Sequence, residues 1–406
     1  MTSYTIAGGG IIGLTTAWTL LQRLGDVEVT VLEKESSVAA HQTGRNSGVV
    51  HSGLYYVPGS LKAELCREGK GLLESYCHTR NLPLETCGKV VVATSAEEIP
   101  RLDKLQARAE ANGVPHERIG PERLRELEPH AFGIDALHVP VSGIVGYGAV
   151  CESLRAEIEA SGRGSMRLAA KVRSISAPEG SQRAEIRLHG GETTHADHVI
   201  NCTGLFSDRI ARASGATPNA RIVPFRGEYF RLTKGAEHLV QNLIYPVPDP
   251  RFPFLGVHFT RMVDGGIECG PNAVFALARE GYSWGKVSPR DLADALTWPG
   301  TWRLFAKHWR TGLGETWRSV SRKAFVKALS RLVPDIRPSH LEPIPAGVRA
   351  QALTRDGNLL DDFAVTSQGG VTHVINAPSP AATASFAIAN HIVDVALGGQ
   401  QRAKGL

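Results

Sequence analysis

The chain has 406 residues, more than one hydrophobic core normally supports, so two domains are the natural expectation. Hydrophobic residues make up 42% and charged residues 21%, which is typical of folded globular proteins, and no apolar run reaches the roughly 20 residues of a membrane-spanning helix. The formal net charge is only +5, and the six scattered cysteines form neither a metal-binding cluster nor a disulfide framework, so we expect reduced thiols and no metal.

The N-terminal residues have the pattern of a βαβ unit. A short strand is predicted at 4–7, an apolar helix at 11–24 and a second strand at 27–32. The loop before the helix reads GGGIIG and contains Gly-x-Gly-x-x-Gly, and the acidic Glu33 follows the second strand. This order of elements predicts a dinucleotide-binding unit. Because the first strand starts so near Met1, we expect no removable leader and a cytoplasmic protein.

Each residue of this loop has a physical role in holding a pyrophosphate. Gly8 permits a tight turn, Gly10 lets the backbone approach the phosphates, and Gly13 lets the helix pack closely on the strand. The free N–H groups at the start of the helix, including that of Ile12, face the phosphates, and Glu33 accepts hydrogen bonds from ribose hydroxyls. The unit predicts a dinucleotide but does not separate FAD from NAD.

Further elements are predicted along the rest of the chain. Strands are expected at 166–175, 184–188, 198–202, 223–232, 254–261 and 266–270, a basic helical stretch at 289–332, and a loop and helix at 376–397. Nucleotide-type segments thus occur at the start, in the middle and at the end, which implies a discontinuous cofactor domain. We assign to that domain residues 1–85, 141–220 and 341–406, and to an inserted substrate domain residues 86–140 and 221–340.

The middle segment narrows the choice of dinucleotide. The strand at 198–202 ends in Thr203-Gly204 and resembles the second nucleotide-contacting strand of flavoproteins with two dinucleotide-binding folds. No second Gly-x-Gly-x-x-Gly is present, so a separate NAD(P)H site is not indicated. We therefore predict FAD in an α/β protein, with a Rossmann-like two-dinucleotide-fold FAD-binding domain and an inserted antiparallel-sheet substrate domain. Electrons then enter from a substrate and leave to oxygen, a quinone or a carrier protein.

Several longer segments resemble one flavoprotein family. They read HQTGRNSGVVHSGLYY at 41–56, PFRGEYF at 224–230, PFLGVH at 253–258 with Thr260-Arg261, GPNA at 270–273, PAGVRAQ at 345–351 and NAPSPAAT at 376–383. Together they resemble the L-2-hydroxyglutarate oxidase/dehydrogenase branch of the D-amino-acid-oxidase-like FAD-dependent oxidoreductases, which also include glycerol-3-phosphate dehydrogenase. The chain departs from that branch at Arg45, where His is expected, and this adds a positive charge near the pyrophosphate or the flavin.

The resemblance also implies where FAD is held. The residues implied to hold the ADP half are Gly8, Gly10, Gly13, Glu33 and Lys34, with the backbone of Val172 against the adenine. Those implied to lie along the pyrophosphate, ribityl chain and flavin are Thr43, Asn46, Ser47, Val49, Thr203 and Gly204. The loop implied to lie under the flavin pyrimidine ring, where its N–H groups stabilise the anionic reduced flavin, consists of Ser379, Pro380, Ala381 and Ala382.

The reaction that the resemblance implies is oxidation of L-2-hydroxyglutarate to 2-oxoglutarate, with hydride transfer from C2 to flavin N5. Such a reaction needs a group that accepts the hydroxyl proton, for which histidine suits, and cations that hold the carboxylates, for which the fork of arginine suits. Two other interpretations stay open. One is a related flavoenzyme acting on another 2-hydroxy acid, an amino acid or glycerol 3-phosphate, and the other is a catalytically silent flavin-binding sensor or scaffold.

Two histidines are candidates for the proton acceptor. His51 lies in the flavin-side loop, and the glycerol-3-phosphate relatives carry a histidine in the matching loop. His258 lies on a predicted strand whose alternation puts it on one face with Phe254 and Gly256, and its alternative role is a hydrogen bond within the sheet. The residues alone leave this choice open.

Arginines are the candidates for binding carboxylates. Arg349 is the first choice and Arg226 the second, and the alternative for each is an ion pair of little energetic value. Because two carboxylates need two cationic contacts, one arginine by itself supports a dicarboxylate substrate poorly. Further candidates for hydrogen bonds to the substrate are Tyr55, Tyr229 and Asn272.

A basic, tryptophan-rich helical segment is predicted at 284–333. Residues 284–341 contain eleven Lys and Arg against four Asp and Glu, an excess of +7. The aromatic residues that recur at spacings of four, three and four, and so share one helical face, are Trp298, Trp302, Phe305 and Trp309. This face either packs on the core of the protein or lies in a membrane interface, which would make the protein peripheral on the inner face of the cytoplasmic membrane through 298–310. Nucleic-acid binding is not expected, because no recognition module accompanies the charge.

Overall fold

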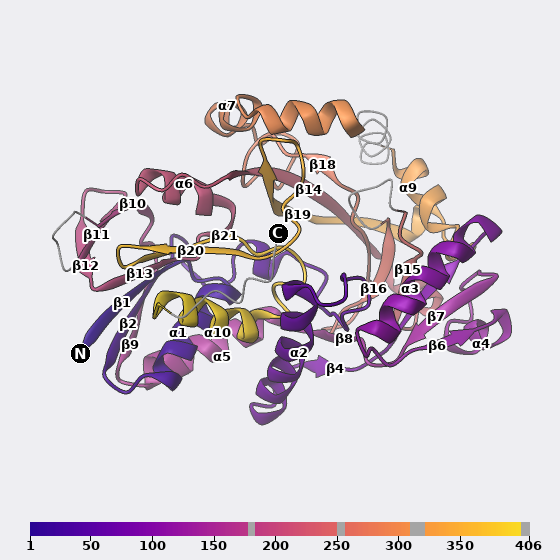
Figure 1. Cartoon of the computed structure of the whole chain (residues 1–406). Coiled ribbons are helices and arrows are strands. Elements are labelled where there is room, and N and C mark those ends of the chain that lie inside the picture. The colour runs from indigo at the N-terminus through magenta and orange to yellow at the C-terminus, as the bar shows by residue number, and fades with distance from the viewer. Residues whose placement is uncertain (178–182, 250–255, 309–320, 399–406) are drawn as a thin grey trace.

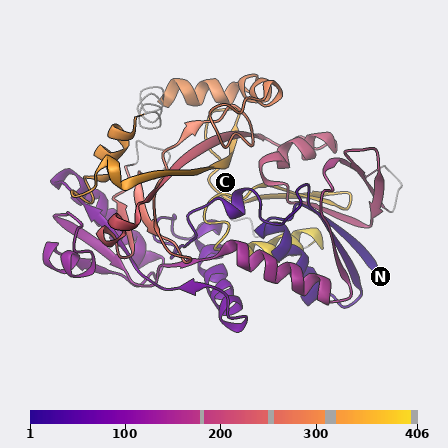
Figure 2. The same cartoon turned by 180° about the vertical axis from the view of Figure 1, so that it is seen from behind.

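Two β-sheets dominate the computed structural model, which describes residues 1–177, 183–249, 256–308 and 321–398 (Figure 1). A six-stranded, mostly parallel sheet lies on the side of the N-terminus, and a nine-stranded, mostly antiparallel sheet lies on the other side. The view from behind shows the same two units, with the chain passing between them (Figure 2). This arrangement confirms the predicted α/β fold with an inserted antiparallel sheet.

The six-stranded sheet contains the predicted dinucleotide-binding strands. In spatial order its strands are β20 (Ala364–Gln368), β21 (Val371–Asn376), β13 (His198–Asn201), β1 (Thr2–Ala7), β2 (Val27–Leu32) and β9 (Gly164–Arg167). All neighbours run parallel except β20, which is antiparallel to β21. Val29 and Val31 of β2 are fully buried, as expected for a parallel sheet that is covered on both faces.

Helices cover one face of this sheet and a small sheet covers the other (Figure 1). The helices are α1 (Ile11–Arg23), α5 (Tyr147–Ala160) and α10 (Ser385–Ala396). The opposite layer consists of β10 (Val172–Ser176), β11 (Ala184–Leu188) and β12 (Thr193–Ala196), followed by α6 (Ser207–Ala213). The predicted strand at 166–175 is therefore two strands in two different sheets. Ile6, Leu14 and Ile388 are buried in the core between β1, α1 and α10, which holds the glycine loop in place.

The nine-stranded sheet forms the inserted part. In spatial order its strands are β18 (Val274–Phe275), β14 (Ala220–Leu232), β17 (Ile267–Gly270), β16 (His258–Arg261), β15 (Leu243–Pro246), β5 (Lys89–Ala93), β7 (Asp135–Val139) and β6 (Glu117–Ile119), with β19 (Leu341–Thr354) paired to β14. Every described pairing is antiparallel except that of β15 with β5. The predicted boundary at residue 341 places β19 in the cofactor domain, whereas its hydrogen bonds join it to β14 in this sheet.

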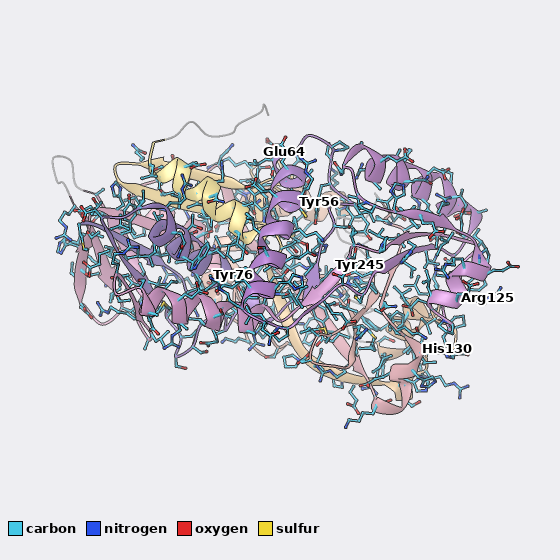
Figure 3. The ribbon with its side chains drawn as sticks, turned by 90° about the horizontal axis from the view of Figure 1, so that it is seen from below. Tyr56, Glu64, Tyr76, Arg125, His130 and Tyr245 are labelled. Atoms are coloured by element: carbon cyan, nitrogen blue, oxygen red, sulfur yellow. The ribbon has the colours of Figure 1, made fainter. Side chains whose placement is uncertain are left out.

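Three further helices and a small sheet complete the fold. The helices are α2 (Leu61–Thr79), α3 (Ile99–Ala111) and α4 (Pro121–Leu127), and a three-stranded sheet contains β3 (Val49–Val50), β8 (Gly143–Val145) and β4 (Leu84–Glu85). Figure 3 shows Tyr56 and Tyr245 toward the middle of the molecule, while Arg125 and His130 mark the outer end beside α4. Residues between β2 and α2 thus reach the junction of the two large sheets.

The basic segment does not form the single helical face that its spacing predicts. It contains α7 (Pro289–Leu296), a helical stretch at 299–308 and α9 (Arg322–Leu329), and Trp309 lies outside the described residues. Trp298 precedes the second helix, is buried, and donates from its indole N–H to the carbonyl of Leu353 (2.9 Å), whereas Trp302 is 59% exposed. Pro299 starts a new helix after Trp298 and breaks the expected periodicity. In the part of the chain that is described, no helix has the length and apolar character to cross a membrane.

Candidate active site

A cavity of about 890 Å³ is lined by residues of both large sheets. Its walls come mainly from the segments 8–12, 32–62, 170–173, 202–213, 347–351 and 374–383. The cavity therefore brings together the three nucleotide-type parts of the sequence. Because these parts lie hundreds of residues apart in the chain, only the tertiary structure makes them neighbours.

The glycine loop borders this cavity with a backbone that glycine alone fits. Gly8 has a φ of 113°, and a Cβ there would lie 2.5 Å from the carbonyl oxygen of Cys202. A Cβ on Gly13 would lie 1.9 Å from the oxygen of Gly8, so Gly13 packs α1 on β1 and does not itself line the cavity. Gly10 and Ile12 line it at the start of α1, where helical N–H groups lack intrahelical partners. The loop thus offers the space and the donors that a pyrophosphate needs.

Glu33 lies beside the glycine loop, immediately after β2, and lines the cavity with a buried side chain. Its Oε2 accepts a hydrogen bond from the backbone N–H of Gly9 (2.7 Å), and its Oε1 accepts one from the N–H of Glu35 (2.9 Å). These two bonds hold the carboxylate against the loop. Lys34 and Val172 line the cavity as well.

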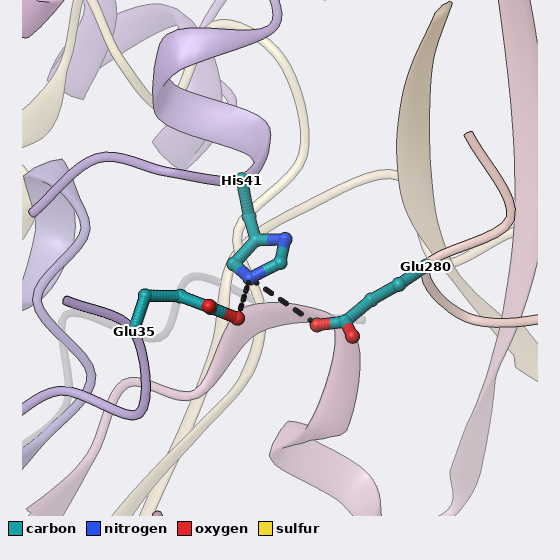
Figure 4. A group of neighbouring side chains, drawn as sticks. All are labelled: Glu35, His41 and Glu280. Atoms are coloured by element: carbon teal, nitrogen blue, oxygen red, sulfur yellow. Dashed lines mark hydrogen bonds and ion pairs between the residues drawn. The ribbon is translucent and has the colours of Figure 1, made fainter. Parts of the chain in front are cut away.

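An ion-pair cluster follows Glu33 at this end of the cavity (Figure 4). His41 Nε2 lies 2.8 Å from Glu35 and 3.3 Å from Glu280, and the Lys34 ammonium contacts both carboxylates. Hydrogen bonds from Lys34 and His41 lower the pKa of Glu35 to about 2. Ligand atoms of Glu35, His41 and Glu280 lie within 4.8 Å of one another, but the Lys34 ammonium already supplies their countercharge. We therefore interpret the group as a set of ion pairs that holds the segment after β2 against the segment that contains Glu280.

Arg45, the position that departs from the family pattern, stacks on an aromatic ring. Its guanidinium carbon lies 4.2 Å from the ring centroid of Tyr282, and its Nε donates to the carbonyl of Ala40 (3.2 Å). The Tyr282 hydroxyl lies 2.6 Å from His41 Nδ1, so Arg45 continues the cluster along the wall. Arginine at position 45 therefore places a cation on the lining of the cavity.

The segment after His41 is folded by its own side chains. The predicted cofactor residues in it that line the cavity are Thr43, Asn46, Ser47 and Val49. Asn46 Nδ2 donates to the carbonyl of Thr43 (2.6 Å), and its Oδ1 accepts from the N–H of Gly48 (2.8 Å). Thr43 Oγ1 accepts a hydrogen bond from the N–H of Ile11 (3.1 Å), which joins this loop to the start of α1.

Thr203 and Gly204 line the cavity after β13. The hydroxyl of Thr203 donates to Oδ1 of Asn201 (2.6 Å), and Nδ2 of Asn201 donates to the carbonyl of Ser207 (2.9 Å). Asn201 is fully buried, so the amide shapes this turn from within the protein. Gly204 has a φ of 52°, which suits the tight turn that follows the strand.

The C-terminal loop before α10 lines the cavity through Ser379, Pro380, Ala381 and Ala382. Thr383, the next residue, accepts a hydrogen bond from the N–H of His51 (3.1 Å) and lies 3.1 Å from the hydroxyl of Tyr147. This contact joins the C-terminal loop to the segment that carries His51. Both loops therefore meet at one end of the cavity.

His51 lies at that end, lines the cavity, and has a buried Nδ1 with no hydrogen-bond partner among the described residues. Burial, followed by the positive charges of Lys89, Lys62 and Arg349, lowers the pKa of His51 to about 3. The imidazole is therefore neutral at neutral pH. A neutral imidazole with a free ring nitrogen has the capacity to accept a proton.

Arg349 of β19 and Tyr229 of β14 line the cavity together, and the two side chains hydrogen-bond each other. Tyr55 also lines it, and its buried hydroxyl has no partner among the residues that the structure describes. Burial raises the pKa of both tyrosines, so both keep their hydroxyl protons at neutral pH. An arginine and two phenol donors at one cavity end suit an anionic substrate.

Arg226 and Asn272 do not line the cavity, contrary to the expected contacts with substrate. Because Gly227 lines it, the preceding Arg226 points to the other face of β14, where it pairs with Glu228 (3.1 Å) and lies 4.0 Å from the ring of Trp284. The Oδ1 of Asn272 accepts a hydrogen bond from the N–H of Glu228 (2.9 Å). Both residues therefore support β14 rather than border the cavity.

His258 also lies off the cavity lining, on β16, which β17 separates from β14. Its ring stacks on Tyr245 with 4.0 Å between centroids, and its Nδ1 lies 3.0 Å from the carbonyl of Gly256. Burial lowers its pKa to about 3. The predicted face shared with Phe254 is not described, since residue 254 lies outside the described ranges. Of the two candidate bases, only His51 borders the cavity.

Several cavity residues carry no signal in the sequence pattern. They are Lys62, Arg108 and Tyr147. Lys62 and Arg108 belong to helices α2 and α3, where a charged residue normally indicates only a solvated face. Their place on the lining follows from helix packing, which periodicity does not specify.

The comparison with known proteins agrees with this geometry. Residues 3–395 match the FAD dependent oxidoreductase (DAO) family. The chain belongs to this family. It is 48% identical over 395 residues to the L-2-hydroxyglutarate dehydrogenase of Indibacter alkaliphilus, covering 97% of this chain and 98% of that protein. It is 43% identical over 393 residues to the protein of the same name from Escherichia coli K12, covering 97% and 92%.

Two solved oxidases share the fold. L-alpha-glycerophosphate oxidase from Mycoplasma pneumoniae, solved with FAD bound, aligns with a TM-score of 0.79 at 20% identity and covers 100% of this chain and 97% of that one. Glycine oxidase from Geobacillus kaustophilus aligns with a TM-score of 0.71 at 16% identity and covers 100% and 97%. The predicted cofactor, FAD, is thus confirmed, and the glycine-only backbone at Gly8 and the first-turn N–H groups of α1, which lack intrahelical partners, fit its pyrophosphate.

Proposed function

We propose that this FAD-dependent oxidoreductase oxidises L-2-hydroxyglutarate to 2-oxoglutarate. The observation that carries the proposal is a buried, neutral histidine, His51, in the same cavity end as Arg349. Relatives that are 43–48% identical over 97% of the chain bear the name of this activity. Solved structures with the same fold are named for glycerophosphate and glycine, so the fold does not select the substrate, and the side chains of the cavity must do so.

The proposed roles follow from the chemistry of each side chain. Bound FAD supplies the acceptor for the hydride equivalent that leaves C2 of the substrate. His51 accepts the hydroxyl proton, for which it is neutral and has a free Nδ1. Arg349 holds the carboxylate next to C2, and the protonated hydroxyls of Tyr229 and Tyr55 donate hydrogen bonds to the substrate. We propose no contact between the substrate and Arg226, His258 or Asn272, because none of the three lines the cavity.

The FAD contacts that we propose are the predicted residues on the cavity lining. For the ADP half and pyrophosphate these are Gly8, Gly10, Ile12, Glu33, Lys34, Val172, Thr203 and Gly204. For the ribityl chain and flavin they are Thr43, Asn46, Ser47, Val49, Ser379, Pro380, Ala381 and Ala382. Gly13 acts on the cofactor only through the packing of α1 against Gly8.

Anaerobic reduction of the bound flavin tests the substrate. We expect L-2-hydroxyglutarate to bleach the flavin absorbance faster than D-2-hydroxyglutarate, L-malate, L-lactate or glycerol 3-phosphate, because cationic groups at the cavity end favour a dicarboxylate of suitable length. Equal or faster reduction by any other compound of the series would contradict the proposal. Reduction by amino acids that survives loss of His51 would instead favour amine oxidation, which needs no alkoxide-forming base.

We also propose that the electrons leave to a membrane quinone and that the surface around Trp302 contacts the bilayer, with a carrier protein or oxygen as the alternative acceptors. The large exposed apolar side chains of the segment 284–302 are Trp284, Val287, Leu296 and Trp302, and the indole N–H of Trp302 donates to the carbonyl of Leu296 (2.7 Å). The basic side chains Arg303 and Lys307 stand exposed beside them. Exposed tryptophan together with Lys and Arg is typical of surfaces that enter an anionic membrane interface.

Cosedimentation with anionic lipid vesicles tests this surface. Trp302→Ser should lower the vesicle-bound fraction by about tenfold, because one large apolar side chain no longer enters the interface. Phe132→Ser is the matched control, since Phe132 is also a large exposed apolar side chain but follows α4, outside the segment 284–308. Sedimentation of the Trp302 variant like the wild type would refute the contact.

A further inference from the structure

Lys89, the first residue of β5, is a buried cation behind the wall of the cavity. Its side chain is 1% exposed, and its ammonium lies 4.6 Å from the ring centroid of Tyr55 and 5.0 Å from that of Tyr245. Tyr55 lines the cavity, whereas Lys89 does not. The ammonium therefore packs on the far side of a ring that borders the proposed substrate position. Apart from its part in lowering the pKa of His51, this charge has no role in the reaction proposed for the site.

The groups that face Lys89 do not neutralise it. They come from α2, from the segment after β3, and from β16, and they are Cys66, His51 and His258. Burial raises the pKa of Cys66 to about 12 and lowers those of both histidines to about 3, so all three are neutral. No carboxylate among the described residues forms an ion pair with Lys89. Within the described protein the charged form of Lys89 therefore has no counter-ion, and an anion bound nearby would favour that charged form.

The surroundings of His51 show the same excess of positive charge. Lys89, Lys62 and Arg349 all act on it as cations. Of these, Lys62 already pairs with Asp361 at 2.9 Å. Tyr55, against whose ring Lys89 packs, presents a buried hydroxyl without a partner in the described structure. This cavity end thus offers more cationic charge and more donors than one carboxylate consumes.

We propose that Lys89 is the specificity-determining residue for the second carboxylate of the substrate, acting through the wall that Tyr55 forms. This inference rests on the proposed function and names the group that makes the site selective for dicarboxylates. Arg349 holds the carboxylate beside the reacting carbon, and the Tyr55 hydroxyl contacts the distant one. The buried ammonium of Lys89 then supplies its countercharge from behind the ring.

Arg108 is the rival cation for this role. It belongs to α3, lines the cavity, and donates from Nη1 to the backbone carbonyl of Tyr55 (2.8 Å). Arg108 is partly exposed, whereas Lys89 is buried, so solvent screens the charge of Arg108 more strongly. The two cations contact the same tyrosine from different sides, which makes Arg108→Met the matched comparison for Lys89→Met.

Binding of unreactive acids to the oxidised holoenzyme tests the proposal independently of turnover. Glutarate and butyrate both carry a carboxylate on a three-carbon chain, and glutarate has a second carboxylate at the other end. Binding of each acid is followed by the change in flavin absorbance. Lys89→Met should weaken glutarate binding by about 10- to 100-fold and butyrate binding by less than about threefold, as expected for loss of one nearby charge. Flavin content and thermal unfolding of the variant verify that it folds, and Lys89→Gln serves as a second variant.

Proton uptake on binding gives a readout that a purely structural role would not produce. Burial lowers the pKa of Lys89 to about 7, so at about pH 8 the amine is mostly neutral, and a bound carboxylate favours its charged form. Calorimetry in two buffers of different ionisation enthalpy should show uptake of a proton with glutarate at about pH 8 and little uptake at about pH 6. Lys89→Met should abolish the uptake.

The outcomes separate this inference from the proposed function. An unchanged glutarate-to-butyrate ratio in Lys89→Met, or a selective loss in Arg108→Met instead, would overturn the role of Lys89 while leaving L-2-hydroxyglutarate oxidation intact. Failure of L-2-hydroxyglutarate to reduce the flavin would refute the proposed function. The binding ratio would still report whether Lys89 selects dicarboxylates.

Discussion

Replacing His51 with glutamine should slow anaerobic reduction of the flavin by L-2-hydroxyglutarate by about 10²- to 10⁴-fold, the usual contribution of a positioned general base. The reason is geometric and electrostatic together. His51 lines the cavity beside Arg349, is neutral, and keeps Nδ1 without a partner among the described residues. Stopped-flow measurement of flavin bleaching at saturating substrate gives the rate directly.

The pH dependence of the same rate has a defined sign. The base must be deprotonated, and because the pKa of His51 is about 3, it stays deprotonated as the pH falls from about 8 to about 5. At saturating substrate, the wild-type rate should therefore not decline through the ordinary histidine range near roughly 6.5. A decline centred there would show that another group, or a less buried His51, accepts the proton.

His258→Gln is the matched control for this prediction. His258 is buried like His51 and has its pKa lowered to the same extent, yet it does not border the cavity. Its replacement should change the rate by less than about tenfold, since it affects only support within the sheet. If His51→Gln and His258→Gln slowed flavin reduction equally, the contact of His51 with the cavity would not explain its effect.

Replacing Arg279 with methionine should lower the free energy of unfolding by about 3–5 kcal/mol, the cost of leaving a buried charge without its partner. Arg279 is 1% exposed and forms a two-pronged pair with Asp208, which is fully buried. Its Nη2 also donates to Asp294 of α7 (2.6 Å), and its Nη1 donates to the carbonyl of Leu205 (2.6 Å). The residue thus joins α6 of the cofactor unit to the segment around α7.

Urea unfolding of the FAD-saturated protein measures this loss, and Arg303→Met provides the control. Arg303 forms an ion pair with Asp356 at 3.4 Å, but the two side chains are 58% and 82% exposed. Solvent screening limits such a pair to about 0–1 kcal/mol. If both substitutions lowered stability by the same amount, burial would not be the cause of the larger effect.

The features of the nucleotide loop that the sequence predicts depend on local geometry. The turn at Gly8, the close packing at Gly13 and the acidic Glu33 all act within one βαβ unit, and their spacing follows from strand and helix repeats. The strands predicted at 27–32 and 184–188 have the observed bounds for the same reason. The spacing of the aromatic residues predicts one continuous helical face from Trp298 onward. The structure instead begins a new helix at Pro299, directly after Trp298.

The remaining features depend on which faces meet across the chain. Arg226 and Arg349 lie on paired strands and look alike in the sequence, yet only Arg349 borders the cavity, since strand alternation puts Arg226 on the face opposite to that of Gly227. Lys89 precedes three valines and reads as the edge of a buried strand, and only the approach of Tyr55 and Tyr245 reveals its charge behind the wall. The amino-acid sequence alone determined the cofactor and the architecture, because these follow from short-range repeats. The side chains that face the substrate were decided by packing between segments hundreds of residues apart.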